Sequence, residues 1–284
     1  MRFRHTRIMM WLIAIGIAGI VTLSGPAFAV PIVEQASGAN AAGIQASVDA
    51  FRVDLGGALN PNVAGSFPSG RREINWDGVP DALSAPNNLP PNFFNVNSPR
   101  GTVFSTPGTA VQVSGNAGVA PVRFDNINPT YSSVFQTFSA QRLFTALGSN
   151  IVDVNFFVPG STNPATVSGF GSVFTDVDLA NTTSIQYFNA NNISLGTFFA
   201  PTANNGLSFL GVSGFGDGIA RVRITNGNSI LGPNDANGNP TDVVVMDDFL
   251  YGEPKAVVPE PSSILLLATG MAGFAWIRKK TASR

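Results

Sequence analysis

The sequence predicts an all-β protein in which two sheets pack face to face as a sandwich. Apolar runs rich in β-branched and aromatic residues recur at intervals of about ten residues, as expected for short strands joined by turns. Glycine (30 residues) and proline (20 residues) are frequent and separate these runs. No long stretch has the apolar spacing of a helix, so two layers of strands fit the pattern best.

The first 29 residues predict a signal peptide with a signal helix. Three arginines among the first seven residues precede an apolar run from Ile8 to Leu23, and Ala27-Phe28-Ala29 follows a Gly-Pro pair. These are the three parts that export and signal peptidase require, so we expect cleavage after Ala29, with Ala27 and Ala29 as the small residues of the site. The alternative is an uncleaved anchor, because the apolar run is nearly long enough to span a membrane.

Residues 30–257 are predicted to form the exported body. Residues 30–115 are predicted as an irregular flank with one helix from Glu34 to Leu55, although a separate small subdomain is an alternative. Residues 116–255 are predicted as the core of the sandwich, because they hold the regularly spaced strand patterns. The expected strands are 119–124, 151–158, 165–178, 184–189, 193–199, 207–212, 219–225 and 243–251.

The last expected strand holds two adjacent acidic residues, Asp247 and Asp248. Strict alternation places them on opposite faces, each in an apolar row, so they should diverge and not form a pair. At least one carboxylate must then enter the core, and a buried charge needs compensation. We expect this from Arg221 or Arg223, from backbone amides, or from a cation.

A calcium site is predicted in the loop before this strand. Asp235, Asn237 and Asn239 recur at every second position, and Asp242 follows them. Calcium loops use this spacing because alternate oxygen-bearing side chains converge on one ion. The loop lacks the glycine and the final glutamate of helix-loop-helix calcium sites, so a solvated polar turn is the alternative. Apart from this structural calcium, no cofactor is expected.

Three other patterns have a structural and a functional interpretation. Asp176 and Asp178 lie two apart on a predicted strand, where a solvated face is favoured over a paired-carboxylate site. The sequence Val-Ser-Gly-Phe-Gly occurs twice, and Phe170 and Phe215 are expected to fill core and not to stack on a sugar. The charged stretch 71–78 is expected to form internal salt bridges, with a ligand site as the alternative.

The composition excludes several classes of function. Cysteine is absent, and the single histidine, His5, lies in the predicted signal peptide. A Ser-His-Asp or Cys-His nucleophile pair, a nitrogen- and sulfur-liganded zinc site and disulfides are therefore excluded. The body keeps nine basic residues against 16 of the 17 acidic residues of the chain, a net charge of about −7. This balance argues against nucleic acid as a partner.

The C-terminal segment, residues 258–284, has three parts in a fixed order. A rigid Pro259-Glu260-Pro261 comes first, the uncharged apolar run 262–277 follows, and Arg278, Lys279 and Lys280 end it. We expect the run to form a single transmembrane helix, although at about 1.5 Å per residue it is somewhat short for a hydrocarbon core of roughly 30 Å. The basic cluster should stay cytoplasmic, which places the body on the other side of the membrane.

This segment resembles a PEP-CTERM sorting signal, the tag of exosortase substrates in Gram-negative bacteria. The residues that carry the resemblance are Pro259, Glu260 and Pro261, the apolar run, and Arg278, Lys279 and Lys280. The resemblance implies that a membrane protease of the exosortase type cuts near the motif, and that the protein is linked to exopolysaccharide and a surface or extracellular destination. The alternative is a plain C-terminal anchor.

The later part of the body is loosely similar to galactose-binding-like jelly-roll modules. Three strand patterns carry this similarity: 209–212, 219–224 with its alternating arginines, and 245–249 with its Asp-Asp pair. We therefore expect a non-enzymatic, exported surface or matrix protein, with signal peptidase, an exosortase-type protease and exopolysaccharide as partners. A carbohydrate-binding module is the first alternative, and a carboxylate-based enzyme acting on polysaccharide is the second.

Overall fold

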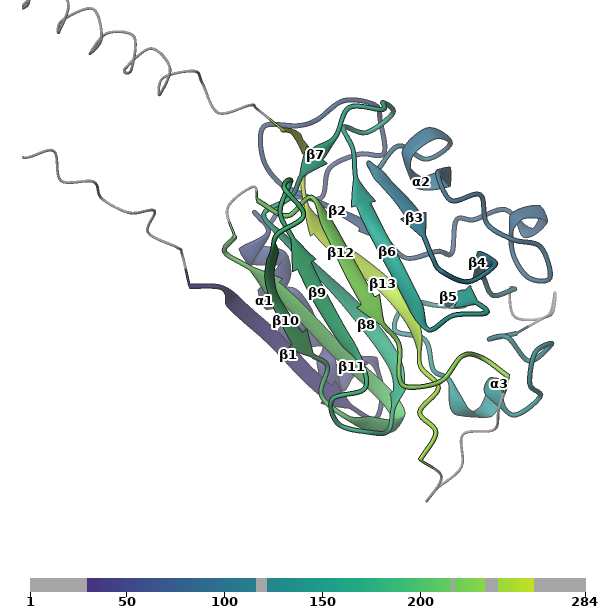
Figure 1. Ribbon diagram of the computed structural model, residues 1–284. Coiled ribbons are helices and arrows are strands. Elements are labelled where there is room, and N and C mark those ends of the chain that lie inside the picture. The colour runs from purple at the N-terminus through teal and green to yellow at the C-terminus, as the bar shows by residue number, and fades with distance from the viewer. Residues whose placement is uncertain (1–29, 116–121, 216–217, 233–239, 258–284) are drawn as a thin grey trace, which may run out of the picture.

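The structure, a computed structural model, describes residues 30–115, 122–215, 218–232 and 240–257. Two antiparallel sheets and several short helices make up this part of the chain (Figure 1). In chain order the elements are β1 (Ile32–Gly38), α1 (Ala41–Asp54), β2 (Arg71–Ile74), the 3-10 helix η1 (Asp81–Leu83), α2 (Phe93–Val96), β3 (Thr102–Ser105), β4 (Ala110–Val113), α3 (Tyr131–Val134), β5 (Phe144–Leu147), β6 (Ile151–Phe156), β7 (Ala165–Thr166), β8 (Gly169–Val177), β9 (Ser184–Phe188), β10 (Ser194–Phe199), β11 (Ala203–Ser213), β12 (Arg221–Thr225), β13 (Val245–Gly252) and β14 (Lys255–Ala256).

The larger sheet has seven strands and the smaller has five. The larger sheet has the order β1-β11-β8-β13-β5-β4, with β2 paired to β13 beside this path, and the smaller has the order β10-β9-β12-β6-β3. Strands from both ends of the chain therefore meet in the larger sheet, and β7 and β14 form a separate two-stranded ribbon. The predicted all-β sandwich is confirmed at this level.

The two sheets enclose one apolar core that both contribute to. Trp76 lies in it with its ring stacked on Phe144 at 4.1 Å, and its Nε1 donates a hydrogen bond to the Asp247 carbonyl. Across the interface, the Tyr187 hydroxyl of β9 donates to the Phe170 carbonyl of β8 at 2.9 Å. Burial of large aromatic rings, each paired edge-to-face or stacked with its neighbours, stabilises this core.

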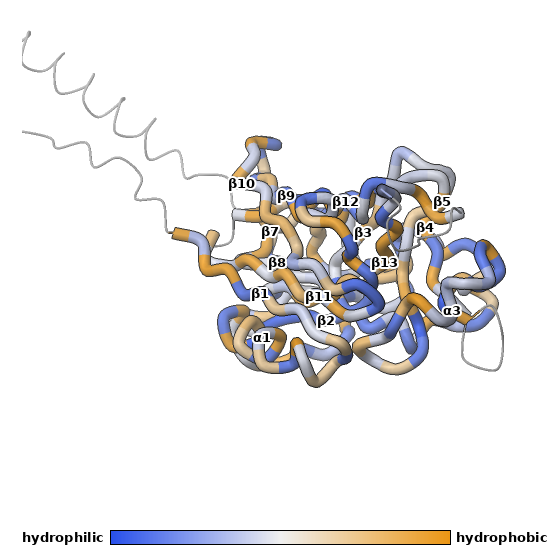
Figure 2. The backbone as a smooth tube through the Cα atoms, turned by 90° about the horizontal axis from the view of Figure 1, so that it is seen from below, coloured by the Kyte–Doolittle hydropathy of each residue, from blue (hydrophilic) through white to orange (hydrophobic). Residues whose placement is uncertain are grey.

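Helix α1 adds a third layer on the outer face of the larger sheet, as Figure 2 shows from below. Its buried residues Ile44, Val48 and Phe51 follow helical spacing and pack on β8 and β11. Phe51 approaches the sheet closely because two glycines face it: a Cβ on Gly211 would lie 2.8 Å from the Phe51 ring, and one on Gly171 would lie equally close. Every residue of β8 and β13 is buried because both faces of these strands are covered.

Several expectations about the first part of the body are wrong. Residues 30–115 are no irregular flank, because β1, β2, β3 and β4 join the two sheets through partners far along the chain. The helix predicted from Glu34 begins at Ala41, and the residues before it pair with β11 as β1. Residues 122–124 of the strand predicted at 119–124 form a bridge and a turn. Local pattern could not show the pairings of β1 and β2 because their partners are more than 100 residues away.

The predicted terminal helices, 1–29 and 262–277, lie outside the described residues. Within the described ranges, no helix has both the length and the apolar character needed to cross a bilayer.

Candidate functional site

The chain that leads to the C-terminal segment is fixed by a buried ion pair. Arg72 of β2 and Glu253, just after β13, make two hydrogen bonds, Nε to Oε2 at 2.7 Å and Nη2 to Oε1 at 2.8 Å. The side chains are 0% and 1% exposed. Asn60 and the Phe67 backbone amide also donate to the Glu253 carboxylate, so its charge is fully compensated.

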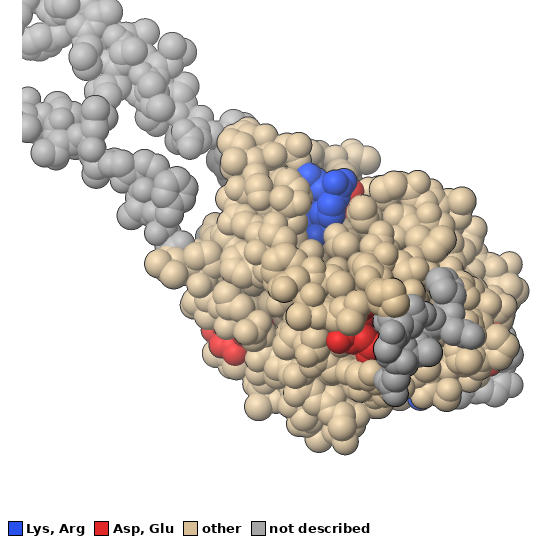
Figure 3. Space-filling model, turned by 60° about the horizontal axis from the view of Figure 1, so that its bottom comes forward, with Lys and Arg blue, Asp and Glu red and all other residues tan. Residues whose placement is uncertain are grey.

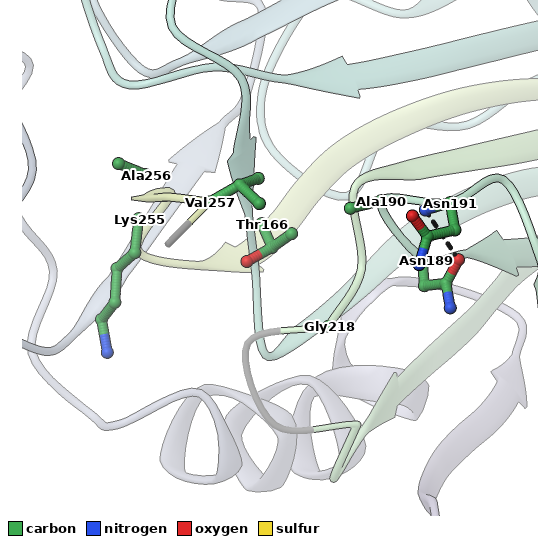
Figure 4. Close-up of a pocket in the computed structure, with 8 residues that line it drawn as sticks. All are labelled: Thr166, Asn189, Ala190, Asn191, Gly218, Lys255, Ala256 and Val257. Atoms are coloured by element: carbon green, nitrogen blue, oxygen red, sulfur yellow. Dashed lines mark hydrogen bonds between the residues drawn. The ribbon is translucent and has the colours of Figure 1, made fainter. Parts of the chain in front are cut away.

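The next residues are held by the small ribbon of β14 and β7. Lys255 pairs with Thr166, Ala256 pairs with Ala165, and the Val257 amide donates to the Pro164 carbonyl at 3.2 Å. Beside the ribbon lies a pocket of about 400 Å³, drawn in Figure 4. Thr166 and β14 form one side of it, and the turn Asn189–Asn191 forms the other. Residues 255–257 are thus held to the body by backbone hydrogen bonds.

The residues predicted to take part in sorting and cleavage lie outside the described residues. These are Pro259, Glu260, Pro261, Arg278, Lys279 and Lys280 at one end, and Ala27 and Ala29 at the other.

A second site lies in the middle of β13, where Asp247 and Asp248 come together. The pairing of β13 with β8 shifts by a bulge between Met246 and Phe249, so alternation is interrupted at the two aspartates. The Ser139 hydroxyl donates to Asp248 Oδ1 at 2.7 Å and lies 3.4 Å from Asp247 Oδ1, and the two carboxyl groups hydrogen-bond to each other. The expectation that these side chains diverge is wrong, because it assumed a regular strand.

The two arginines that were expected as one possible compensation for these carboxyl groups pair with another residue. Arg221 and Arg223 both pair with Asp153 on the neighbouring strand β6, at 2.7 and 2.8 Å. Asp247 instead accepts a hydrogen bond from the Phe138 backbone amide at 2.6 Å. A backbone amide, as expected, and a hydroxyl therefore stabilise the pair.

Burial changes the acidity of this pair. Burial, followed by the neighbouring Asp248 charge, raises the pKa of Asp247 well above its ordinary value. Burial likewise raises the pKa of Asp248 to about 6, against the hydrogen bond from Ser139 that lowers it. The pair therefore retains a proton at pH values where an exposed aspartate has lost it.

Asp248 opens onto a pocket of about 570 Å³, which we call the polar pocket. Glu73 lines it from β2 and accepts two hydrogen bonds from Arg52, at 2.9 and 3.0 Å, and one from Arg71 at 2.6 Å. Burial raises the pKa of Glu73, but these hydrogen bonds outweigh it, so the pKa ends below its ordinary value. The remaining lining is mostly amide, guanidinium and hydroxyl groups with one aromatic ring: Gln45, Asn60, Asn62, Asn75, Arg100, Phe138 and Ser139, together with Leu59 and Pro61.

Of the predicted calcium ligands, the structure describes Asp242 alone. Its buried carboxylate accepts hydrogen bonds from the backbone amides of Asp178 and Leu179, at 3.1 and 3.4 Å, and from the Thr182 hydroxyl. Asp235, Asn237 and Asn239 lie outside the described residues. Among the described residues, no cluster of three carboxylate, histidine or cysteine side chains is arranged to hold a metal. The calcium site stays a prediction.

The other sequence patterns have structural roles. Phe170 is fully buried, and Phe215 packs on Tyr187 at 5.3 Å, so both rings contribute to packing. The solvated face expected for Asp176 is wrong, because this residue is buried. Its backbone has a φ of +67°, which interrupts alternation, and its carboxylate accepts a hydrogen bond from the Asn205 amide. The charged stretch 71–78 does form salt bridges, as expected. The sequence analysis predicted neither the pairing of Arg72 with Glu253 nor the hydrogen bonds of Ser139 to Asp247 and Asp248. No local signal links partners that are more than 100 residues apart.

Comparisons with known proteins identify the C-terminal segment. Residues 257–279 match the family described as PEP-CTERM protein-sorting motif. No curated protein matches the sequence. Among solved structures, the enzymatically active domain of bacteriophage CBA120 tailspike protein 4 aligns with 58% of this chain and 20% of its own, at 13% identity and a TM-score of 0.27, a likeness too low to support an argument. The match shows that this chain carries a PEP-CTERM sorting motif and is an exported, transiently membrane-anchored substrate of an exosortase-type system.

Proposed function

We propose that the body is a non-catalytic cell-surface or matrix protein, which is cut near Pro259-Glu260-Pro261 and left to interact with exopolysaccharide. The observation that carries the proposal is the position of the sorting motif. The match begins at Val257, which is hydrogen-bonded to Pro164 of the body, so the segment that the protease recognises follows directly on the sandwich. The buried Arg72–Glu253 pair and the β7–β14 ribbon hold that end in place.

The polar pocket is where we propose that a glycan binds. Sugar hydroxyl groups need many hydrogen-bond partners of both kinds, and this pocket offers carboxylate, amide and guanidinium groups beside the Phe138 ring. The body has few positive charges, so a neutral glycan suits it better than a polyanion. This carbohydrate-binding role is the alternative to a purely structural one.

The sorting proposal is tested by replacing Pro259-Glu260-Pro261 with three alanines in the native host. We expect the variant to accumulate in the membrane fraction with its C-terminal segment intact, whereas the wild type is cut and leaves that fraction. A matched control replaces the exposed residues Val53 and Asp54 at the end of α1 with alanine and should be processed normally. Equal processing of wild type and motif variant contradicts the proposal.

One observation favours an enzyme as a second candidate function. Asp248 and Glu73 line the same pocket, and their pKa values are displaced in opposite directions, as in glycosidases that use one acid and one carboxylate. Against it, Glu73 is bound by Arg52 and Arg71, which occupy the carboxylate that would have to act on a substrate. Turnover of a glycan that is lost in both Asp248→Asn and Glu73→Gln would establish the enzyme; no turnover across a broad glycan panel removes it.

A further inference from the structure

Exposed apolar side chains gather at the end of the body from which the sorting segment leaves. They are Val30, Ile32 and Val33 at the start of β1, Ile193 in the turn between β9 and β10, and Val257 at the end of the described chain. Their exposed fractions are 85%, 49%, 40%, 59% and 38%, respectively. We call this group the exit face. Other apolar side chains are exposed elsewhere on the body, and the exit face differs from them in lying where the sorting segment leaves.

Gly214 and Gly218, which both follow β11, lie next to the two sides of the exit face. Ile32 pairs with Ser213, the last residue of β11, and the Cβ position of Gly214 lies 3.3 Å from the Ile32 nitrogen. Gly218 lines the pocket beside Val257. The start of the body and its end therefore lie on the same side of the molecule (Figure 1), and the start of β1 is apolar in Figure 2.

The turn between β9 and β10 completes the exit face. Asn189, Ala190 and Asn191 line the pocket opposite Val257 (Figure 4). The Ile193 amide donates to the Asn189 side chain at 3.0 Å, so the exposed isoleucine is held next to the pocket. Phe199, at the other end of β10, pairs with Ser184 and lies at the opposite end of the sheet.

The sequence limits how far this face can be from a membrane. The apolar run begins at residue 262, five residues after Val257. At about 3.3 Å per residue, a fully extended segment of this length reaches roughly 16 Å. The polar layer of a bilayer leaflet is roughly 5–8 Å thick, so an inserted run keeps the exit face at or near the lipid headgroups.

The charge on this end suits such a position. Figure 3 shows uncharged surface between the two points where the chain leaves the body. Lys255, beside the pocket, and Glu34, on β1, have opposite signs. The acidic excess of the body therefore has little effect here, and apolar contact with lipid is not opposed by a strong like charge.

We propose that the exit face lies against the outer surface of the membrane while the sorting segment is inserted, with Ile32, Ile193 and Val257 in contact with the headgroup region. This inference rests on the membrane insertion of the sorting segment in the proposed function. Contact with lipid holds the body in one orientation and brings the motif to a fixed height for the membrane protease. Cutting the segment then removes the tether and leaves contacts too few to retain the body.

The absence of cysteine allows a direct test with single labels. Full-length Ile193→Cys and Phe199→Cys variants carry one environment-sensitive fluorophore each, and Phe199, 44% exposed on the same strand, is the matched control. Both are reconstituted in phosphatidylethanolamine and phosphatidylglycerol vesicles that contain lipid with a quencher in its headgroup. We expect strong quenching at residue 193, little at residue 199, and loss of the difference in a chain that ends at Val257.

The outcomes separate the inference from the proposed function. Quenching at residue 193 alone supports contact of the exit face with lipid. Equal and weak quenching at both positions, in protein that floats with the vesicles, overturns that contact but leaves the membrane segment intact. Protein that fails to float contradicts the membrane insertion itself and overturns both.

Discussion

Arg72 and Glu253, 181 residues apart in the chain, form an ion pair that is closed to solvent. The pair joins β2 to the end of β13 and so fixes the chain four residues before the body ends at Val257. Arg72 also donates to the Pro61, Gly65 and Pro99 carbonyls, so one side chain ties two loops to the base of the sorting segment. The position of the sorting segment thus depends on the fold of the whole body.

Removing one partner of this pair should destabilise the body strongly. Glu253→Gln leaves the Arg72 charge buried with one hydrogen-bonding oxygen less, and we expect a loss of about 3–5 kcal/mol in the free energy of unfolding. Urea denaturation measures the loss. Arg223→Met is the control, since Arg223 is 41% exposed and its pair with Asp153 contributes about 1 kcal/mol or less. Equal losses in the two variants contradict the role assigned to the buried pair.

The carboxyl pair should make the body less stable as pH rises. The pKa of Asp248 is raised by burial from 3.8 to about 6, so the folded state binds a proton that the unfolded state has lost. The free energy of unfolding therefore falls between pH 4 and pH 6, by on the order of 3 kcal/mol from this group, and does not recover above it.

The comparison with Asp248→Asn isolates this contribution from that of carboxyl groups such as Glu73. The pKa of Glu73 is lowered in the folded state, so its contribution to stability changes with pH in the opposite direction. Melting temperatures from pH 4 to pH 7 should show the wild type falling relative to the variant. Asp54→Asn, at an exposed carboxylate at the end of α1, should run parallel to the wild type. Parallel curves for wild type and Asp248→Asn would be inconsistent with a buried, proton-binding pair.

The close contact of α1 with the larger sheet requires Gly211. A Cβ at this position would lie 2.8 Å from the Phe51 ring and 2.9 Å from the Phe209 ring, so Gly211→Ala should cost about 1–3 kcal/mol. Adding Phe51→Leu should restore part of the loss by making room. Gly78→Ala, where nothing lies within 4 Å, should be nearly neutral. Chemical denaturation of the wild type and these three variants measures the differences in stability. A neutral Gly211→Ala would contradict the close packing of Phe51 on the sheet.

Calcium should stabilise the body if Asp235, Asn237, Asn239 and Asp242 bind it. At a calcium concentration 100 times the dissociation constant, the gain is about 2.7 kcal/mol. The melting temperature should rise with calcium and fall with a chelator. Asn237→Ala should abolish this response, while Asn191→Ala, at an exposed position in the turn between β9 and β10, should keep it. A melting temperature that changes with neither calcium nor chelator would exclude this calcium site.

The sequence predicted the sheets of the second half of the body well, because their strands are short, regular and separated by clear turns. Strands predicted at 151–158, 184–189 and 243–251 correspond to β6, β9 and β13. The first half was less predictable for a physical reason. β1, β2 and β3 are stabilised by pairing with strands far along the chain, and their own sequences carry weak strand signals.

The site was predictable only in part for a similar reason. Two adjacent aspartates in an apolar strand correctly indicated a buried carboxyl group. A β-bulge interrupts the alternation of side chains between the two faces of the strand. The two aspartates, which would diverge on a regular strand, therefore form a hydrogen-bonded pair. The Ser139 hydroxyl and the Phe138 amide come from a loop more than 100 residues earlier, and only the folded chain brings them to the pair.

The sorting account is tested most directly by the intact mass of the protein recovered from its native host, in membrane and medium fractions. We predict a mature species that lacks residues 1–29 and also lacks the residues that follow the Pro259-Glu260-Pro261 motif. A product that keeps Arg278–Arg284 in every fraction would contradict processing and leave a simple membrane-anchored protein.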